Sequence, residues 1–176
     1  MRISRIGLSL LLLFFGTGMF GVETPELEPG NKTILFHLER NRDNNQVYYA
    51  LNVDKQGRIN KTDPISTYWK KEGQPDKQIP LSSLQQKYGY GVKIVSIGSN
   101  EVRFYVAAYP DGVFTAKRKD GEYVSLFQAG KKEVTMSKLY VHFKGTSFWN
   151  PVILKIDVYG LDAQHKEYLV RELIPK

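Results

Sequence analysis

The stretch that decides the fold runs from residue 101 to residue 144 and reads EVRFYVAAYPDGVFTAKRKDGEYVSLFQAGKKEVTMSKLYVHFK. Short runs of alternating apolar and polar residues are separated by three turn signals, Pro110-Asp-Gly112, Asp120-Gly121 and Ala129-Gly130. Alternation with a period of two is typical of strands with one buried face, and Asp-Gly is typical of tight hairpins. The stretch therefore predicts four strands in series, over residues 101–109, 113–119, 122–128 and 133–144.

The same alternation continues on both sides of this stretch and predicts further strands over residues 33–40, 46–53, 65–71, 92–97, 152–159 and 167–174. Residues 41–45 and 72–77 are predicted as polar loops, and residues 145–151 as a longer connection that holds Phe148 and Trp149. One short helix is expected over residues 81–88, with Ser82 or Ser83 as its cap, Gly89 at its end, and one face that carries Leu81, Leu84 and Tyr88.

About nine or ten strands with short connections favour antiparallel neighbours. The predicted fold is mainly β, a single-domain antiparallel barrel or sandwich with one short helix. Alternation alone does not distinguish the barrel from the sandwich, because both bury one face of each strand.

The N-terminal residues 1–21 have the pattern of a signal peptide. Arg2 and Arg5 precede an apolar run that is short for a membrane span, and Gly18 and Gly21 are both candidate cleavage positions. An uncleaved N-terminal anchor is the alternative. Residues 22–32 are expected to form an extended leader and residues 33–176 a single β-rich domain, so the protein is predicted to be exported, either periplasmic or secreted.

Composition narrows the chemistry. The chain has no cysteine, which excludes disulfides, thiol catalysis and cysteine-ligated metals. The formal charge of +7, or +5 without Arg2 and Arg5, favours anionic partners in general. The basic clusters 117–119 and 131–132 lie beside turn signals and are interpreted as solvated edges, so no nucleic acid partner is expected. No cofactor is expected, nor a stable membrane span after signal cleavage.

Strand phase predicts a candidate binding face. Several strands carry one apolar face and a second face that mixes tyrosine with basic groups, a combination that suits anions and sugars because rings stack and cations meet oxygens. The alternative is an ordinary sheet with one dry and one wet face. The candidate ligand-binding residues are Glu39, Arg40, Asn45, Tyr48, Tyr68, Arg103, Tyr105, Tyr140 and His142.

Catalysis and metal binding have little support in the sequence. His37, His142 and His165 have no metal-ligand spacing, so no metal site is predicted. Glu39 is the best acid/base candidate, although a carboxylate between His37 and Arg40 is more often part of a structural ion pair. No catalytic residue is assigned, and an enzyme is the less favoured class.

Several composite signatures together resemble a family of exported bacterial proteins known only as domain of unknown function 4833. They are Glu39-Arg40-Asn41, Asn45 with Val47-Tyr48-Tyr49, Pro64 with Tyr68-Trp69, Tyr88-Gly89-Tyr90-Gly91, and the ending 156–162 with 170–174. The resemblance spans nearly all of the chain after the leader. It implies export and a mostly β domain, and it transfers no activity and no site residues.

Three functions follow as hypotheses. The first is a non-enzymatic ligand-binding or envelope-associated protein, whose partner is an anionic or sugar-like small molecule or an envelope protein. The second is a hydrolase of cell-envelope or other glycans that uses Glu39 as acid/base, which requires a second carboxylate across a cleft. The third is a structural partner in an assembly, which requires an exposed apolar patch.

Overall fold

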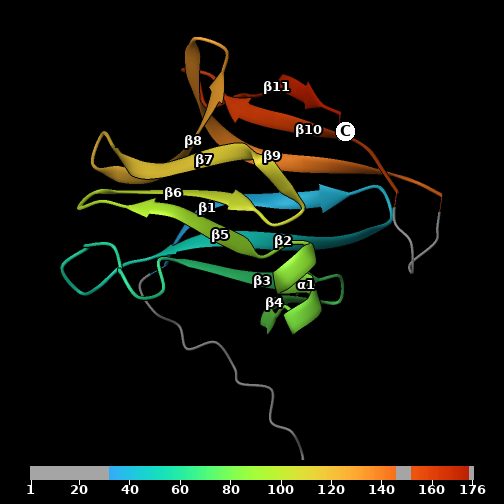
Figure 1. Ribbon diagram of the computed structural model, residues 1–176, viewed down its shortest axis with the longest axis horizontal. Helices are drawn as coiled ribbons and strands as arrows, with labels where there is room; N and C mark the ends of the chain where they lie inside the picture. The colour runs from blue at the N-terminus through green and yellow to red at the C-terminus, as the bar shows by residue number, and fades with distance from the viewer. Residues whose placement is uncertain (1–31, 146–151, 175–176) are drawn as a thin grey trace, which may run out of the picture.

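The strands of this chain join in one mixed sheet, which the computed structural model describes over residues 32–145 and 152–174 (Figure 1). The predicted signal peptide, most of the leader, and Phe148 and Trp149 lie outside the described residues. The elements are β1 (Lys32–Arg40), β2 (Asp43–Asn52), β3 (Ile65–Lys71), β4 (Gln74–Pro80), α1 (Ser83–Tyr88), β5 (Val92–Ile97), β6 (Glu101–Val106), β7 (Tyr109–Lys119), β8 (Glu122–Ala129), β9 (Lys132–Lys144), β10 (Val152–Leu161) and β11 (Glu167–Leu173).

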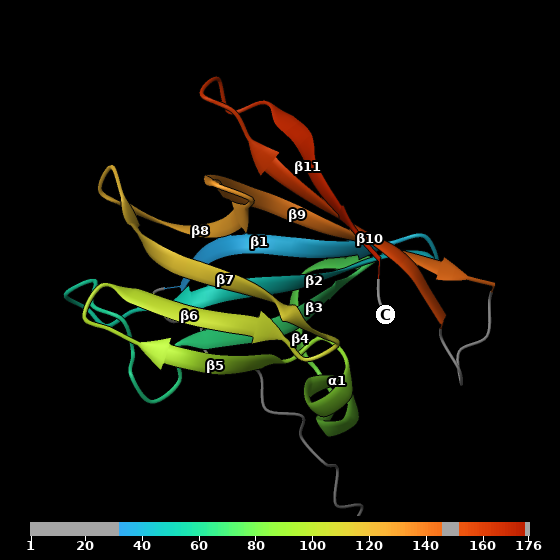
Figure 2. The same ribbon diagram turned by 45° about the horizontal axis from the view of Figure 1, so that its top comes forward.

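Strand β9 joins two wings of the sheet. Its first residues pair with β8, residues 138–141 pair with β1, and β10 runs along its other edge from Thr135 to Lys144. The wing β1–β2–β3–β4 and the wing β8–β7–β6–β5 therefore leave β9 from the same edge and fold over each other (Figure 2). Because β4 and β5 end the described sheet, it is an open, folded sandwich, which confirms the predicted mainly β architecture.

Consecutive strands pair antiparallel, as expected, except β4 and β5, which stand at opposite ends of the strand order. In contrast, β1 and β9 pair in parallel. Strands that are parallel neighbours need a long connection between them, and here that connection is almost the whole of both wings.

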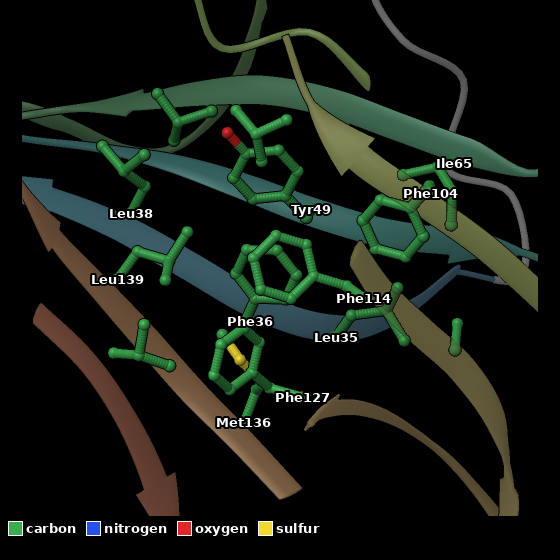
Figure 3. Close-up of a cluster of buried hydrophobic side chains, with 14 of the residues drawn as sticks. Leu35, Phe36, Leu38, Tyr49, Ile65, Phe104, Phe114, Phe127, Met136 and Leu139 are labelled. Atoms are coloured by element: carbon green, nitrogen blue, oxygen red, sulfur yellow. The ribbon is translucent and has the colours of Figure 1, made fainter. Parts of the chain in front are cut away.

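The core lies between the two wings. Figure 3 shows Phe36 of β1 and Tyr49 of β2 meeting Phe104 of β6 and Phe114 of β7. The ring centroid of Phe36 lies 4.5 Å from that of Tyr49, 5.3 Å from that of Phe114 and 6.3 Å from that of Phe104. Such aromatic pairs add about 0.5–1.5 kcal/mol each beyond the burial of their area, so this cluster fixes how the wings stack.

Strand β1 contains a β-bulge, so its side chains do not alternate strictly between the two faces of the sheet. The pairing of β1 with β2 shifts register between Ile34 and Phe36, and both Leu35 and Phe36 are buried. Strict alternation places these two neighbours on opposite faces. The extra residue of the bulge brings both inward, while His37 and Glu39 keep the outer face.

Two predicted irregular segments are wrong. Most of the predicted loop 72–77 belongs to β4, which tolerates Pro75 and Pro80 because it is an edge strand. The β6–β7 turn lies at Ala107–Ala108, and Pro110–Gly112 form a bulge inside β7. The reason is tertiary, since the amides of Ala107 and Ala108 donate to the carbonyls of Gly91 and Gly89 at 2.8 and 2.9 Å.

Helix α1 forms where it is predicted. Ser82 and Gln85 make a reciprocal capping box, and Gly89 ends the helix. Leu81 precedes the cap and is buried, so it does not share the predicted face with Leu84 and Tyr88, which are 72% and 65% exposed. With six residues α1 is short, and no helix in the described part of the chain is long and apolar enough to cross a bilayer.

Candidate functional site

The outer face of β1, β2 and β3 carries a ladder of aromatic rings. Tyr48 stacks between His37 and Tyr68, with centroid distances of 5.5 and 5.8 Å, and the ammonium of Lys70 lies 4.8 Å from the Tyr48 ring. These are cross-strand neighbours, because Tyr48 pairs with His37 on one side and with Tyr68 on the other. Tyr48 and Tyr68 thus share one face of the sheet, where Tyr68 is only 1% exposed.

Glu39 lies beside this ladder at the centre of an ion-pair network. Its Oε1 is 3.0 Å from His37 Nε2 and accepts a hydrogen bond from Gln46 Nε2 at 3.0 Å. Its Oε2 is 3.5 Å from Lys138 Nζ, which also binds Glu167 at 2.9 Å. Burial favours the neutral acid, but the hydrogen bond with His37 and the charge of Lys138 outweigh it and lower the pKa of Glu39.

The network continues onto β9 and β10. Tyr140 pairs across strands with both Glu39 and Asp157, and its ring lies 4.8 Å from that of His142. His142 Nε2 is 2.7 Å from Asp157 Oδ2, and Lys155 Nζ is 3.2 Å from Asp157 Oδ1. Burial raises the pKa of Asp157, but the contacts with His142 and Lys155 lower it by more. Polar groups on this face are thus largely partnered by one another.

Three other predicted residues lie elsewhere. Asn45 accepts a hydrogen bond from the backbone N–H of Glu72 at 2.9 Å and so ties the ends of β2 and β3 together. Arg103 and Tyr105 lie on β6 in the other wing, on the face opposite the buried Phe104. The structure therefore brings together Glu39, Tyr48, Tyr68, Tyr140 and His142, and separates them from Asn45, Arg103 and Tyr105.

Arg40 turns to the inner face. Its Nε and Nη2 donate to the two carboxylate oxygens of Asp43 at 3.0 and 2.7 Å, and its Nη1 donates to the Tyr90 hydroxyl at 2.6 Å. The guanidinium also lies 4.5 Å from the centroid of a Trp69 ring. Burial opposes the charge of Arg40, but its hydrogen bonds with Asp43 and Tyr90 raise its pKa. Arg40 thus joins the first hairpin to the segment after α1.

Beyond Arg40 a cavity of about 810 Å³ opens between the β1–β2 turn, α1, the β6–β7 turn and the ends of β9, β10 and β11. Its wall is mostly apolar. The aliphatic and aromatic residues that line it are Leu38, Leu84, Tyr88, Tyr90, Val106, Ala108, Tyr109, Phe114, Leu139, Val141, Phe143, Ile153, Ile156 and Leu173. The charged residues of the wall, as far as the chain is described, are Arg40, Arg42 and Asp43.

Arg42 was not among the predicted binding residues, because it lies in a predicted loop, where alternation does not assign a side chain to either face of the sheet. Asn41 holds the turn against β9, since its side-chain amide accepts from the N–H of Phe143 at 2.9 Å and donates to the Phe143 carbonyl at 3.2 Å. The Arg42 guanidinium then lies 4.2 Å from the centroid of the Phe143 ring. Leu84 and Tyr88 were a second signal of the cavity in the sequence, because two large apolar residues on one face of such a short helix need something to pack against.

A second hollow of about 650 Å³ lies beside the first residues of β8 and β9 and the β10–β11 turn. Charges of both signs line it, including Lys119, Glu122, Lys132, Glu133 and Asp162. Over residues 32–145 and 152–174, no cluster of three or more histidine or acidic side chains is arranged to hold a metal ion.

A family model described as a domain of unknown function, DUF4833, matches residues 36–171. That stretch begins within β1 and ends within β11, so it includes both the outer network and the cavity. Comparison with curated proteins finds no match, and neither does comparison with solved structures. With more than two thirds of its length matched, the chain belongs to the DUF4833 family.

Proposed function

We propose that this protein is an exported, non-enzymatic binding protein that holds one largely apolar small molecule in the cavity next to α1. The observation that carries the proposal is the cavity itself. Its volume of about 810 Å³ is in the range of small-molecule sites, which are mostly apolar with a few polar groups that orient the ligand. The proposed binding site is therefore the interior cavity and not the outer, tyrosine-rich face.

The entrance supports the same interpretation. Leu84 and Tyr88 line the cavity and are 72% and 65% exposed, which is unusual for large apolar side chains on such a short helix. The described contacts of α1 include its own capping box and a bond from Trp69 Nε1 to Gln85 Oε1 at 3.3 Å. The backbone after α1 is fixed by the bonds of Gly89 and Gly91 with Ala108 and Ala107. We therefore expect the exposed side chains of Leu84 and Tyr88 to move on ligand entry.

The hydrolase alternative has less support. Glu39 lines neither cavity. Its lowered pKa disfavours the protonated form that a general acid needs and is compatible only with the role of a base. The carboxylate that shares Lys138 with it, Glu167, belongs to the same ion-pair network. We expect Glu39→Gln to change stability and to leave ligand binding intact. The assembly hypothesis predicts instead that the apolar residues around α1 bury against another protein.

The test is saturable binding of the neutral apolar dye N-phenylnaphthylamine, measured by fluorescence. Ile153→Trp adds a large ring to the cavity wall, whereas Leu154→Trp places the same ring at the adjacent, half-exposed position outside that wall. We expect Ile153→Trp to weaken binding at least about tenfold, equivalent to about 1.4 kcal/mol, and Leu154→Trp to leave it unchanged. Absence of saturable binding, or equal effects of the two variants, contradicts the proposal.

Export is part of the proposal and has its own test. Expression of the full chain in a bacterial host, followed by N-terminal sequencing of the protein from the periplasm and medium, should give a mature chain that begins after Gly18 or Gly21. Recovery of the uncleaved chain in the membrane fraction supports the anchor alternative.

A further inference from the structure

We infer that the ligand of this cavity is a monocarboxylate with an apolar body, and that Arg42 binds its carboxylate side-on. The inference rests on the proposed function, since it names the chemical class of the molecule in that cavity. It is carried by the unsatisfied hydrogen-bond donors of Arg42 and by the net charge of the cavity wall.

Arg42 has an unused pair of donors. Its Nε and Nη2 are shielded from solvent and have no hydrogen-bond partner among the described residues. Buried donors without acceptors are unfavourable, and those of a charged group especially so. The guanidinium lies over the Phe143 ring, which supplies no acceptor for these N–H groups.

Arg40 shows what this donor pair can hold. In Arg40 the same two nitrogens, Nε and Nη2, grip both carboxylate oxygens of Asp43 at 3.0 and 2.7 Å. Parallel N–H groups on one edge of a guanidinium match the two oxygens of a carboxylate, which makes this pairing geometrically specific. Arg42 has the same edge two residues later, and no carboxylate of the described residues binds it.

The net charge of the wall favours a single negative charge on the ligand. Of the three charged residues that line the cavity, Arg40 and Asp43 neutralise each other and Arg42 is left. One carboxylate balances this excess, whereas a dianionic phosphate adds a further negative charge near Asp43. The other walls, such as Leu139, Ile156 and Leu173, are apolar and suit a hydrocarbon body.

The side chain of Arg42 is also able to reach its ligand. The residue as a whole is only partly buried, and its backbone is fixed by the two bonds between Asn41 and Phe143. The inferred binding requires this long side chain to turn about its terminal bonds when the ligand binds, so that the Nε–Nη2 edge, which is shielded in the structure, meets the carboxylate while the turn itself stays in place.

The experiment is displacement of N-phenylnaphthylamine by dodecanoate and by dodecanol, which share a hydrocarbon chain and differ in charge. We expect the wild type to bind dodecanoate at least about tenfold more tightly than dodecanol. Arg42→Gln should abolish this preference without weakening dodecanol, and Arg42→Lys, which keeps the charge without the fork, should restore only part of it. Arg103→Gln removes one positive charge from the opposite wing and should change neither affinity.

Outcomes separate the two proposals. If the dye and dodecanol bind but dodecanoate binds no more tightly, or if Arg42→Gln and Arg103→Gln act alike, the inference about Arg42 is overturned and the binding function stands. If neither the dye nor either ligand binds saturably to the folded wild type, both fall. Circular dichroism of each variant identifies any loss of fold, and Arg42→Lys provides the second variant should Arg42→Gln unfold.

Discussion

Replacing Arg40 by leucine tests whether this residue holds the first hairpin to the segment after α1. Leucine keeps much of the aliphatic packing but removes the paired bond with Asp43, the bond to the Tyr90 hydroxyl and the guanidinium beside Trp69. The side chain of Arg40 is 12% exposed and that of Asp43 is 35% exposed. The interactions are therefore only partly screened by water.

The expected cost follows from these contacts. We assign about 1 kcal/mol to the partly exposed pair with Asp43, about 1.5 kcal/mol to the charged hydrogen bond with Tyr90, and about 0.5–1 kcal/mol to the cation–π contact. The variant should thus lose roughly 3 kcal/mol of unfolding free energy, which corresponds to a fall in Tm of about 6–12 °C for a chain of this size.

Urea unfolding followed by circular dichroism measures this change. Tyr90→Phe should lose about half as much, because it removes the hydroxyl acceptor alone. Arg58→Leu is the matched control, since Arg58 pairs with Asp54 at 2.7 Å but is 73% exposed, and its midpoint should not move. A loss below about 1 kcal/mol in Arg40→Leu, or an equal shift in Arg58→Leu, refutes the structural role of Arg40.

Three further predictions concern stability. The Tyr49 hydroxyl is fully buried without a partner among the described residues, so Tyr49→Phe should leave the unfolding free energy unchanged or raise it by about 1 kcal/mol; a clear loss in calorimetry argues for a hidden acceptor. A methyl group on Gly160 would collide with Val134 Cγ1 and lie 2.9 Å from the carbonyl oxygen of Thr135, so Gly160→Ala should lose about 1–3 kcal/mol of unfolding free energy. Gly98→Ala should lose less, because the atom nearest to its new methyl group is Cγ of the exposed Glu101 side chain at 3.2 Å. The lowered pKa of Asp157 stabilises the fold above the ordinary aspartate pKa and this contribution is lost as pH falls through the native pKa, so the wild-type advantage over Asp157→Asn should shrink below about pH 4 in acid titrations; a constant difference over that range contradicts the assignment.

Part of the candidate site was predictable from local pattern. A period of two places Tyr48, Tyr140 and His142 opposite the apolar rows of their strands, and the structure has them on the outer face. The same period places Arg40 with Phe36 and Leu38 on the inner face, a signal that the predicted binding face ignored. Arg42 had no such signal, because a turn residue has no strand phase, and its position depends on the bonds between Asn41 and Phe143.

The sequence by itself determined ten of the eleven described strands, all but β4, together with the Asp120-Gly121 hairpin and both ends of α1. These features depend on neighbours a few residues apart. Asp120 and Gly121, for example, adopt φ of 51° and 90°, which the Asp-Gly pair tolerates and a tight hairpin requires. Capping by Ser82 and the stop at Gly89 are equally local.

The tertiary structure alone decided which strands lie side by side and what they enclose. Alternation specifies the face of a residue but not its neighbouring strand, so the parallel pairing of β1 with β9 was not encoded in any single run. That pairing brings the β1–β2 turn against Phe143 and, with α1 and the β6–β7 turn, closes the cavity around Arg42. The cavity exists because segments that are distant in the chain meet there, and the local pattern of residues carries no information about which segments will meet.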